Sequence, residues 1–377
     1  MHVLYLFPHF TSHGGAASFV LNSAQRLTER GVKVTIVAQE GKEDIISSCR
    51  GVDFRFVGGP LPKSIGHWIG YPIIFDRVSK EIREADPDII FPHVFPANYW
   101  GFLYKAMNPE AKCVWYCHEP SAFVHDPAVI DELPDNLRTM AMLVNPMMAH
   151  ADRMLVKKCD RLLVNSKYTA GRVRQCYGIE SELIYTGIDC SEYPVGQGSK
   201  ERFFLSAGRL TKFKNVDLSL RAIAELKRSG RKGDLIVAGD GPELAPLVEL
   251  SSKLDIRDRV QFIGDISRKD LISLYSRAYC VVFPSVNEPF GLISIEAQAA
   301  STPVIAFNSG GCAETVIHGE TGLLVEPFDH TSLARAMTFA LDNEEWMLHM
   351  GRRGRDNVRN KFSWTRTING LMAAFTE

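Results

Sequence analysis

Two glutamates eight positions apart, Glu288 and Glu296, enclose the segment of this chain whose residues most clearly indicate a ligand-binding site. The apolar run 278–283 predicts a strand, and a helix pattern begins just after Gly291. A strand that leads through a glycine-bearing turn into a helix leaves backbone N–H groups to face an anion. The residues that would present these groups are Phe290, Gly291 and Leu292. The segment therefore predicts a site for a ligand with hydroxyls beside a phosphate, flanked by the two carboxylates.

Two cations follow another predicted strand. Arg209 and Lys214 lie between the apolar run 203–207 and a helix pattern that begins near residue 216. Fixed cations stabilise the negative charge that builds up on a diphosphate as its bond to carbon breaks. The alternative is a solvated basic loop, which is the usual place for lysine and arginine. The position at a strand end favours the diphosphate.

Glycine-bearing turns follow two further strands. Gly239, Asp240 and Gly241 permit a tight turn close to a ligand, although many α/β turns look like this. Gly14 and Gly15 let the backbone approach a ligand at the start of the first helix. The turn at Gly14 and Gly15 does not match G-x-G-x-x-G, and the chain has no G-x-x-x-x-G-K-[ST] loop. A nicotinamide dehydrogenase and a P-loop NTPase are therefore disfavoured.

His118 ends the predicted strand 113–117, where its imidazole could act in catalysis or serve the structure alone. Strand alternation places Cys113 and Cys117 on the opposite face from His118, which excludes a zinc site there. The pair Asp86 and Asp88 precedes a strand, so we expect a turn at its amino end and no metal site.

The composition narrows the class of protein. A length of 377 residues with 45% hydrophobic residues predicts two domains, and the net charge of −1 gives no reason to expect a nucleic acid partner. The eight cysteines are scattered without a C-x-x-C, which is typical of buried thiols in a reducing compartment. The N-terminus lacks the basic region of a signal peptide, and no apolar stretch reaches the roughly 18 residues that span a bilayer. We expect a cytoplasmic protein.

Strand and helix patterns alternate over 1–187 and again over 200–357, with a polar stretch at 188–199 that predicts a linker. This rhythm predicts the α/β class, with two doubly wound, Rossmann-like domains. We expect them to face a central cleft lined by the carboxyl ends of their strands, where ligands bind in such folds.

Together these motifs resemble the retaining nucleotide-sugar glycosyltransferases of family 4 (GT4), which have the two-domain GT-B architecture. Glu288 and Glu296 resemble the E-x7-E element of that family, and Arg209 with Lys214 resembles its diphosphate clamp. The pair Gly310-Gly311 is another landmark that the family shares. The resemblance spans most of the chain, and it implies that a helix over about 362–377 crosses back onto the first domain.

The resemblance also implies roles for the site residues. Glu288 would contact the donor sugar, Glu296 the ribose hydroxyls, and His118 would be the histidine of the cleft. Arg209 and Lys214 would hold the diphosphate. The remaining contacts implied with the nucleotide sugar come from Phe290, Gly291, Leu292, Gly14, Gly15, Gly239, Asp240, Gly241 and the backbone around Ile266. Phe213 departs from the family pattern, where proline or glutamate is more usual before the clamp lysine.

The implied reaction moves a hexose from an NDP-sugar, either GDP-mannose or a UDP-sugar, to a glycan or lipid-linked glycan with retention of configuration, as in polysaccharide biosynthesis. No metal or other cofactor is expected, because the cations and the helix N-terminus supply positive charge. A sugar-nucleotide epimerase or hydrolase of the same architecture, or a non-catalytic sugar-nucleotide-binding subunit, is the alternative. The sequence indicates no oligomeric state.

Aromatic, methionine and basic positions in the first domain could meet a lipid-linked acceptor at an anionic membrane surface. Core packing and an ordinary solvated face explain them equally well. These positions are Trp68, Tyr71, Met147, Met148, Arg153, Lys157, Lys158 and Arg161.

Overall fold

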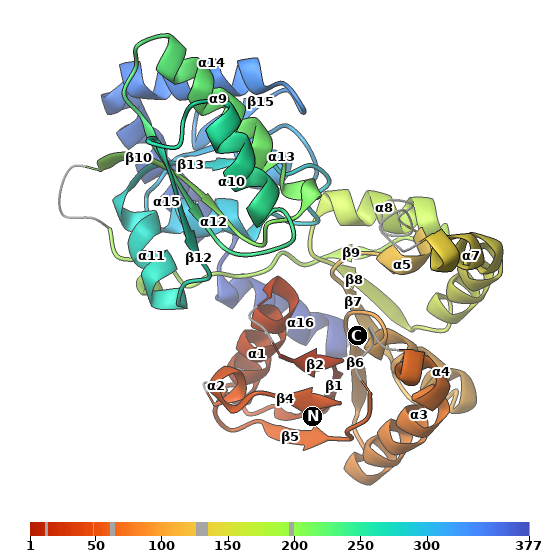
Figure 1. Cartoon of the computed structure of the whole chain (residues 1–377). Coiled ribbons are helices and arrows are strands. Elements are labelled where there is room, and N and C mark those ends of the chain that lie inside the picture. Colours follow the sequence, from red (N-terminus) through yellow and green to blue (C-terminus); the bar gives the residue numbers. More distant parts are fainter. Residues whose placement is uncertain (12–13, 48, 61–64, 126–134, 196–199, 377) are drawn as a thin grey trace. The chain divides into compact units, whose positions relative to one another are not determined.

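The computed structural model describes residues 1–11, 14–47, 49–60, 65–125, 135–195 and 200–376. They form two compact units, the first made of Met1–Thr186 and Thr367–Glu377 and the second of Gly187–Arg366. Figure 1 follows the chain through both. No helix among these described segments is long and apolar enough to cross a membrane.

The first unit is built on parallel strands, and the central ones are buried along almost their whole length. Their order is β5-β3-β1-β6, and β7-β8-β9 continues it through a bridge between Ile90 and Cys113. The strands are β1 (His2–Leu6), β3 (Lys33–Ala38), β5 (Asp53–Phe56), β6 (Ile89–Pro92), β7 (Val114–Cys117), β8 (Arg161–Val164) and β9 (Glu182–Leu183), with a short pair β2 (His9–Phe10) and β4 (Glu40–Gly41) beside them.

Helices connect these strands, as right-handed crossovers between parallel strands require. They are α1 (Gly15–Thr28), α2 (Glu43–Ile46), α3 (Ile65–Ala85), α4 (Ala97–Met107), α5 (Ala122–His125), α7 (Asp135–Val156) and α8 (Lys167–Tyr177). The last helix, α16 (Trp364–Thr376), returns to this unit. Its Thr367 hydroxyl donates to the Tyr185 carbonyl (2.8 Å), and its Phe375 ring meets Phe91 edge to face at 5.0 Å.

The second unit repeats the architecture with the strand order β12-β11-β10-β13-β14-β15, all parallel. Its strands are β10 (Glu201–Ala207), β11 (Asp234–Ala238), β12 (Val260–Gly264), β13 (Ala278–Phe283), β14 (Val304–Phe307) and β15 (Gly322–Val325). Its helices are α9 (Val216–Arg228), α10 (Leu244–Lys253), α11 (Arg268–Arg277), α12 (Leu292–Ala299), α13 (Cys312–Thr315), α14 (His330–Asp342) and α15 (Glu344–Lys361), with 3-10 turns η1 (Cys190–Glu192) and η2 (Lys212–Lys214). The prediction of two Rossmann-like α/β domains is confirmed.

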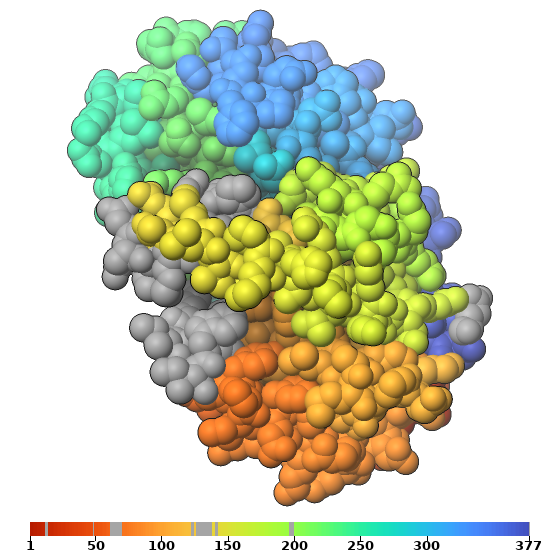
Figure 2. Space-filling view, turned by 90° about the vertical axis from the view of Figure 1, so that its right-hand side faces the viewer, coloured from red at the N-terminus to blue at the C-terminus, as the bar shows by residue number. Residues whose placement is uncertain are grey.

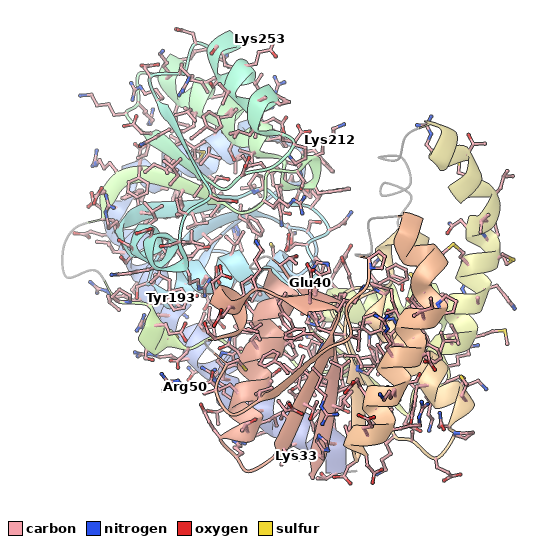
Figure 3. The ribbon with its side chains drawn as sticks, turned by 60° about the horizontal axis from the view of Figure 1, so that its bottom comes forward. Lys33, Glu40, Arg50, Tyr193, Lys212 and Lys253 are labelled. Carbon is pink, nitrogen blue, oxygen red and sulfur yellow. The ribbon has the colours of Figure 1, made fainter. Side chains whose placement is uncertain are left out.

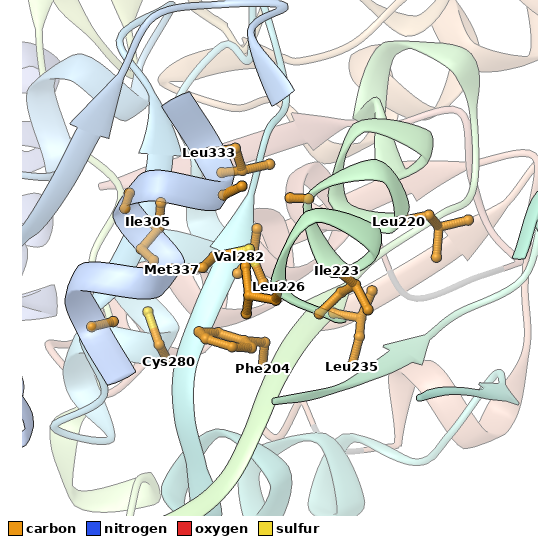
Figure 4. Packing of buried hydrophobic residues seen from close by; sticks show 14 of the residues in the cluster. Phe204, Leu220, Ile223, Leu226, Leu235, Cys280, Val282, Ile305, Leu333 and Met337 are labelled. Atoms are coloured by element: carbon orange, nitrogen blue, oxygen red, sulfur yellow. The ribbon is translucent and has the colours of Figure 1, made fainter. Parts of the chain in front are cut away.

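The core of the second unit lies where α9 and α14 pack on one face of its sheet (Figure 4). Leu220, Ile223 and Leu226 recur at helical spacing on α9, so one stripe of the helix is apolar and buried. They pack against side chains such as Phe204 of β10, which is 1% exposed. Truncating a leucine in such a stripe to alanine typically costs about 2–5 kcal/mol of stability.

The predicted linker, 188–199, lies partly outside the described residues. Its described part belongs to the second unit, where η1 packs on α15. Arg355 of α15 donates to the carbonyl oxygens of Cys190 and Tyr193, each at 2.8 Å. These residues are therefore anchored to the second unit.

Candidate functional site

Apart from Glu296, which lies on a helix, the site residues that the sequence predicts in the second unit lie in or at the end of loops that follow strands. The strand order reverses at β10, whose neighbours β11 and β13 lead to opposite edges of the sheet. Doubly wound sheets bind ligands at such a reversal. The loops that follow β10 and β13 carry Arg209, Lys214, Glu288, Phe290, Gly291 and Leu292.

Lys214 and Glu288 form the central ion pair of these loops. The Lys214 ammonium donates to Oε2 of Glu288 at 2.5 Å, and the Ser285 hydroxyl donates to the same oxygen at 3.0 Å. The ammonium also lies 5.1 Å from the centre of the Phe283 ring. The two side chains are 22% and 20% exposed, so a ligand can reach both charges. The contact between the clamp lysine and the first glutamate could not be predicted from their spacing in the sequence.

Asn215 ties the two loops together, and the sequence reading missed it. Its backbone is left-handed, with φ at +47°, a conformation that asparagine tolerates better than most residues. Its amide donates to the carbonyl oxygens of Phe213 and Pro284, each at 3.1 Å. The Phe213 carbonyl is a second acceptor, at 3.3 Å, for the single hydrogen of the Ser285 hydroxyl, which it shares with Glu288. The atypical Phe213 thus supports the ion pair through its backbone.

Gly310 and Gly311, which follow β14, pack closely against the Glu288 loop. The Gly311 N–H donates to the Glu288 carbonyl at 2.7 Å. A Cβ atom on Gly311 would lie 2.5 Å from Cα of Phe290, and one on Gly310 would lie 2.6 Å from the Glu288 carbonyl oxygen. Only glycine fits at either position, which gives these family landmarks a physical role.

Helix α12 begins at Leu292, directly after Gly291, whose φ of +88° favours glycine. The first turn of α12 contains no acidic residue, so no side chain there offsets its positive end. The Glu288 loop leads into this helix end, where a phosphate would be stabilised.

Glu296 lies on the second turn of α12 and is almost buried, with 8% of its surface exposed. Its Oε1 accepts from Arg268 at 2.5 Å and its Oε2 accepts from the Tyr275 hydroxyl at 2.9 Å. Arg268 also donates to the Tyr193 hydroxyl. Burial first, and then the charge of Glu296, raise the pKa of Tyr275, which therefore stays protonated as a donor. A carboxylate oxygen accepts more than one hydrogen bond, so Glu296 keeps capacity for ribose hydroxyls.

The sequence reading missed Arg268 and Tyr275. They stand seven residues apart on α11, and this spacing puts them on one face of the helix. That spacing, on the helix that follows the loop of Ile266, was the available signal. Ile266 itself is half-buried between β12 and α11.

The turn at Gly239, Asp240 and Gly241 braces the loop that holds Arg209. A Cβ atom on Gly239 would collide with the Gly208 carbonyl, and one on Gly241 would collide with the Leu210 carbonyl. The Leu210 N–H donates to the Asp240 carbonyl at 2.9 Å. The glycines are therefore needed for contact between two loops. Arg209 itself is exposed.

In the first unit, Gly14 precedes α1 in an extended conformation and Gly15 is the first helical residue. A Cβ atom on Gly14 would meet nothing within 4 Å, so the described surroundings do not require glycine there. That open space and the absence of acidic residues from the first turn of α1 suit the predicted approach of a ligand. The preceding His13 lies outside the described residues.

His118 follows β7 and pairs with His93, which follows the neighbouring strand β6. Nδ1 of His93 lies 3.2 Å from Nε2 of His118. Burial lowers the pKa of His118 to about 3, and burial followed by the proximity of His118 lowers the pKa of His93 well below its usual range. Both imidazoles are therefore neutral at physiological pH. The sequence reading missed His93, although it follows its strand just as His118 does.

Asp86 and Asp88 form a turn at the amino end of β6, as predicted. Asp86 has a left-handed φ of +46°, and Oδ2 of Asp88 accepts from the His2 N–H at 2.6 Å. Within the described ranges, no three histidine, cysteine or acidic side chains are grouped to hold a metal ion.

Two family models match the chain in succession. "Glycosyltransferase Family 4" matches residues 13–192, and "Glycosyl transferases group 1" matches residues 193–357. A D-inositol 3-phosphate glycosyltransferase of Nocardia farcinica is 26% identical, in an alignment that covers 96% of this chain and 84% of that protein.

Two solved structures share the fold. Sucrose-phosphate synthase from Thermosynechococcus elongatus has a TM-score of 0.79 at 21% identity, with 99% of this chain and 98% of that one covered. HepE of Anabaena in complex with UDP and glucose has a TM-score of 0.81 at 17% identity, with 100% and 99% covered. The family models, the relatives and the two Rossmann-like units agree with the motifs: the chain belongs to the GT4 type of glycosyltransferase with the GT-B fold and is a hexosyltransferase.

Proposed function

We propose that this enzyme transfers a hexose from a nucleoside diphosphate sugar to a glycan or lipid-linked glycan, with retention of configuration. The observation that carries the proposal is the accessible Lys214–Glu288 pair where the second sheet reverses, beside the N-terminus of α12. This arrangement offers a cation, a carboxylate and a helix end to one ligand. A sugar diphosphate has hydroxyls and phosphates to match all three.

Arg209 and Lys214 serve the leaving group in this proposal. As the bond between the anomeric carbon and the diphosphate breaks, negative charge accumulates on the phosphate oxygens. Lys214 is already held by Glu288, which the Ser285 hydroxyl holds in turn, so the charge of Lys214 needs little reorganisation to stabilise the transition state. The N-terminus of α12 adds its positive end. We propose no metal in this step.

Glu288 and Glu296 would bind opposite ends of the donor, the sugar and the ribose respectively. Glu288 would accept hydrogen bonds from the sugar, whereas Glu296, oriented by Arg268 and Tyr275, would accept them from the ribose. Because Lys214 and Ser285 engage Glu288, we assign it a binding role and no nucleophilic one. Retention then favours front-face attack, in which the departing phosphate removes the acceptor proton. We assign His118 to contact the reacting sugar.

We favour a UDP-sugar over GDP-mannose as the donor, because the structure of HepE contains UDP and glucose. A thermal-shift screen with UDP, GDP, ADP and their sugars tests this choice. A ligand at a hundred times its Kd adds about 2.7 kcal/mol to the free energy of unfolding. Acceptors are then screened with the donor found, and D-inositol 3-phosphate is included because relatives carry that name.

Lys214→Ala tests the function, with Lys212→Ala as its matched control. Lys212 belongs to the same turn η2 and is exposed at the surface of the second unit (Figure 3). We expect Lys214→Ala to lower kcat/KM for sugar transfer by about 10²–10³-fold, the usual effect of losing one group that stabilises transition-state charge. Lys212→Ala should stay within about twofold of the wild type, since surface charges contribute little. Equal losses in both variants would refute the assignment of Lys214.

Release of free or epimerised sugar without any acceptor would favour the epimerase or hydrolase. Binding of a nucleotide sugar without any turnover would favour the non-catalytic subunit. Each outcome can be read from the same donor after incubation with the wild-type enzyme.

We also propose that the first unit touches an anionic membrane through α7, which lies on the face seen in Figure 2. The helix exposes an apolar stripe in which Leu143 is 79% and Met147 is 70% exposed. Lys157 and Lys158 are exposed just beyond its end. Apolar residues flanked by lysines are typical of helices that lie on anionic lipid.

Not all of the positions named from the sequence belong to this surface. Tyr71 packs against the core, and the side chain of Trp68 lies outside the described part. Arg153 donates to the Cys176 carbonyl at 2.8 Å, and Arg161 pairs with Glu182 at 3.5 Å. These contacts give the two arginines and Tyr71 structural roles.

Sedimentation with anionic vesicles tests the membrane contact. Leu143→Ser and Met147→Ser together should abolish binding without lowering Tm, because both side chains are exposed. Ile317→Ser, at an exposed apolar residue of the second unit, is the control and should bind as the wild type does. Wild-type protein that stays in the supernatant would end this proposal.

A further inference from the structure

We propose that His93 is a positioning residue that fixes the tautomer of His118, so that His118 offers Nδ1–H as a hydrogen-bond donor to the substrate. The inference deepens the proposed function, because it takes the contact between His118 and the sugar from that proposal. It concerns which atom of His118 carries the proton, and the two rings of the first unit decide this.

The hydrogen bond between the rings requires one donor and one acceptor. Nδ1 of His93 and Nε2 of His118 are 3.2 Å apart, so one of them carries a proton and the other does not. A neutral imidazole holds one proton in all. The location of the proton on either ring therefore fixes it on the other.

The surroundings of His93 decide between the two arrangements. His93 is completely buried, and its Nε2 has no hydrogen-bond partner within the part of the chain that the structure describes. Tyr5 stacks on the ring at 5.2 Å and Phe91 meets it edge to face at 4.6 Å. An orphaned buried N–H is rarer in proteins than an under-satisfied acceptor. Nε2 of His93 is therefore the bare nitrogen, and Nδ1 carries the proton.

His93 consequently donates to Nε2 of His118, and the one proton of neutral His118 lies on Nδ1. Nδ1 of His118 forms no hydrogen bond within the described ranges, and the residue is partly exposed. It can donate to an oxygen of a bound ligand. His118 is thus a neutral donor that cannot act as a base through Nδ1.

The backbone holds both rings in register. The Trp115 indole N–H donates to the His93 carbonyl at 2.9 Å, and the Asn165 amide donates to the His118 carbonyl at 2.9 Å. Phe19 lies edge to face with His118 at 5.3 Å. Neither ring can easily turn away from the other. The tautomer is therefore fixed before any ligand binds.

The ¹⁵N chemical shifts of labelled histidine report the tautomer directly. The His118 signals are assigned by their loss in His118→Gln. We expect a protonated Nδ1 and a bare Nε2 in the wild-type protein, without change between about pH 6 and 8. A protonated Nε2 on His118 would overturn the inference. This readout needs no substrate, so it is independent of the proposed function.

Two substitutions of His93 then test its role in turnover. His93→Asn keeps an amide N–H close to the position of Nδ1, whereas His93→Phe fills the ring space without a donor. We expect His93→Phe to lower kcat by about 10- to 100-fold with the donor KM nearly unchanged, as for other residues that orient a functional imidazole. His93→Asn should recover most of the loss. Equal losses in both variants, or full activity in His93→Phe, would contradict the inference.

Discussion

The two units order their parallel strands in the same way, yet the side chains that gather beyond the strand ends are chemically opposite. In the second unit the loops pair charges, with Lys214 on Glu288 and, close by, Arg268 on Glu296. In the first unit the residues just after β6 and β7, His93 and His118, meet as neutral rings among aromatic side chains. The same scaffold thus presents ionic groups in one unit and uncharged hydrogen-bonding groups in the other.

The difference follows from how far the groups of each site are exposed to water. Lys214 and Glu288 remain about one-fifth exposed, so a charged ligand can displace the water around this ion pair. His93 is completely buried, where a cation would cost several kcal/mol. The second unit therefore suits the diphosphate and ribose of a donor. The first unit suits hydroxyl groups, which are neutral.

The largest effect should come from Glu288→Ala, which removes the proposed sugar contact and leaves Lys214 without its partner. We expect kcat/KM to fall by about 10³-fold, at the upper end for the loss of one active-site group. Glu320→Ala is the matched control, because Glu320 pairs with Arg353 at 2.6 Å on the exposed surface of the same unit. Its activity should stay within about twofold. Comparable losses of steady-state sugar transfer in Glu288→Ala and Glu320→Ala would contradict a specific role for Glu288.

A backbone change should be nearly as damaging. Gly311→Ala puts a Cβ atom 2.5 Å from Cα of Phe290, so the Glu288 loop must shift. A displacement of about 1 Å can cost 10²-fold in rate. We expect kcat/KM to fall by about that factor, with a lower Tm.

Gly171→Ala is the control for this change, since its Cβ atom meets nothing within 4 Å and the residue is helical. Removal of a helical glycine should stabilise the first unit by about 0.5–1 kcal/mol. If Gly311→Ala behaved like Gly171→Ala in calorimetry and activity, the claim that close packing at Gly311 positions the Glu288 loop would be contradicted.

Arg268→Met should have an intermediate effect. It keeps a long apolar side chain but removes the donor from Oε1 of Glu296. We expect the donor KM to rise by about tenfold, because a charge-assisted hydrogen bond contributes about 1.5–3 kcal/mol. Arg277→Met on the same helix is the control, since Arg277 pairs with Glu201 where both are about half exposed, at 51% each. An unchanged KM in Arg268→Met would show that Glu296 needs no fixed orientation.

The smallest effects concern stability against pH, and they should have opposite signs in the two units. Burial lowers the pKa of His125, but the hydrogen bonds and charges of Asp152 (2.6 Å) and Cys176 together outweigh this and raise the pKa to about 9. The first unit should therefore have this contribution in full below about pH 6.5 and lose roughly 1–3 kcal/mol as the pH rises through 9.

Burial lowers the pKa of Lys200 in the second unit to about 8. Its unfolded form binds the proton more tightly, so that unit should gain stability as the pH rises from 8 toward 10. Hydrogen exchange read by mass spectrometry measures each unit separately. His125→Gln should flatten the fall in the first unit, and Lys200→Met should flatten the rise in the second. Slopes of the same sign in both units would contradict the assignments.

The strands of the second unit could be predicted because they are short buried runs bounded by glycine, proline and polar turns. The bounds of β13 agree with the predicted run 278–283, and α9 and α12 begin where the sequence predicts, at Val216 and just after Gly291. The long helices α3 and α7 were not recognised, and each contains a proline, Pro72 and Pro146 respectively, which usually ends a helix.

The site residues were harder to predict, because their partners are distant in sequence. Lys214 meets Glu288 across 74 positions and His93 meets His118 across 25. Motif spacing finds the glycines and glutamates of one loop. It contains no information on which loops the strand order brings side by side.

The central claim is that the charged loops of the second unit bind the donor diphosphate. Isothermal titration of the full-length chain with UDP, or with the diphosphate that binds most tightly in the screen, tests it directly. Wild type, Lys214→Ala, Lys212→Ala and His93→Phe are compared. The affinity should fall at least about tenfold in Lys214→Ala alone, as expected for one lost charge-assisted contact. An equal fall in Lys212→Ala, or a fall in His93→Phe without one in Lys214→Ala, would contradict the account.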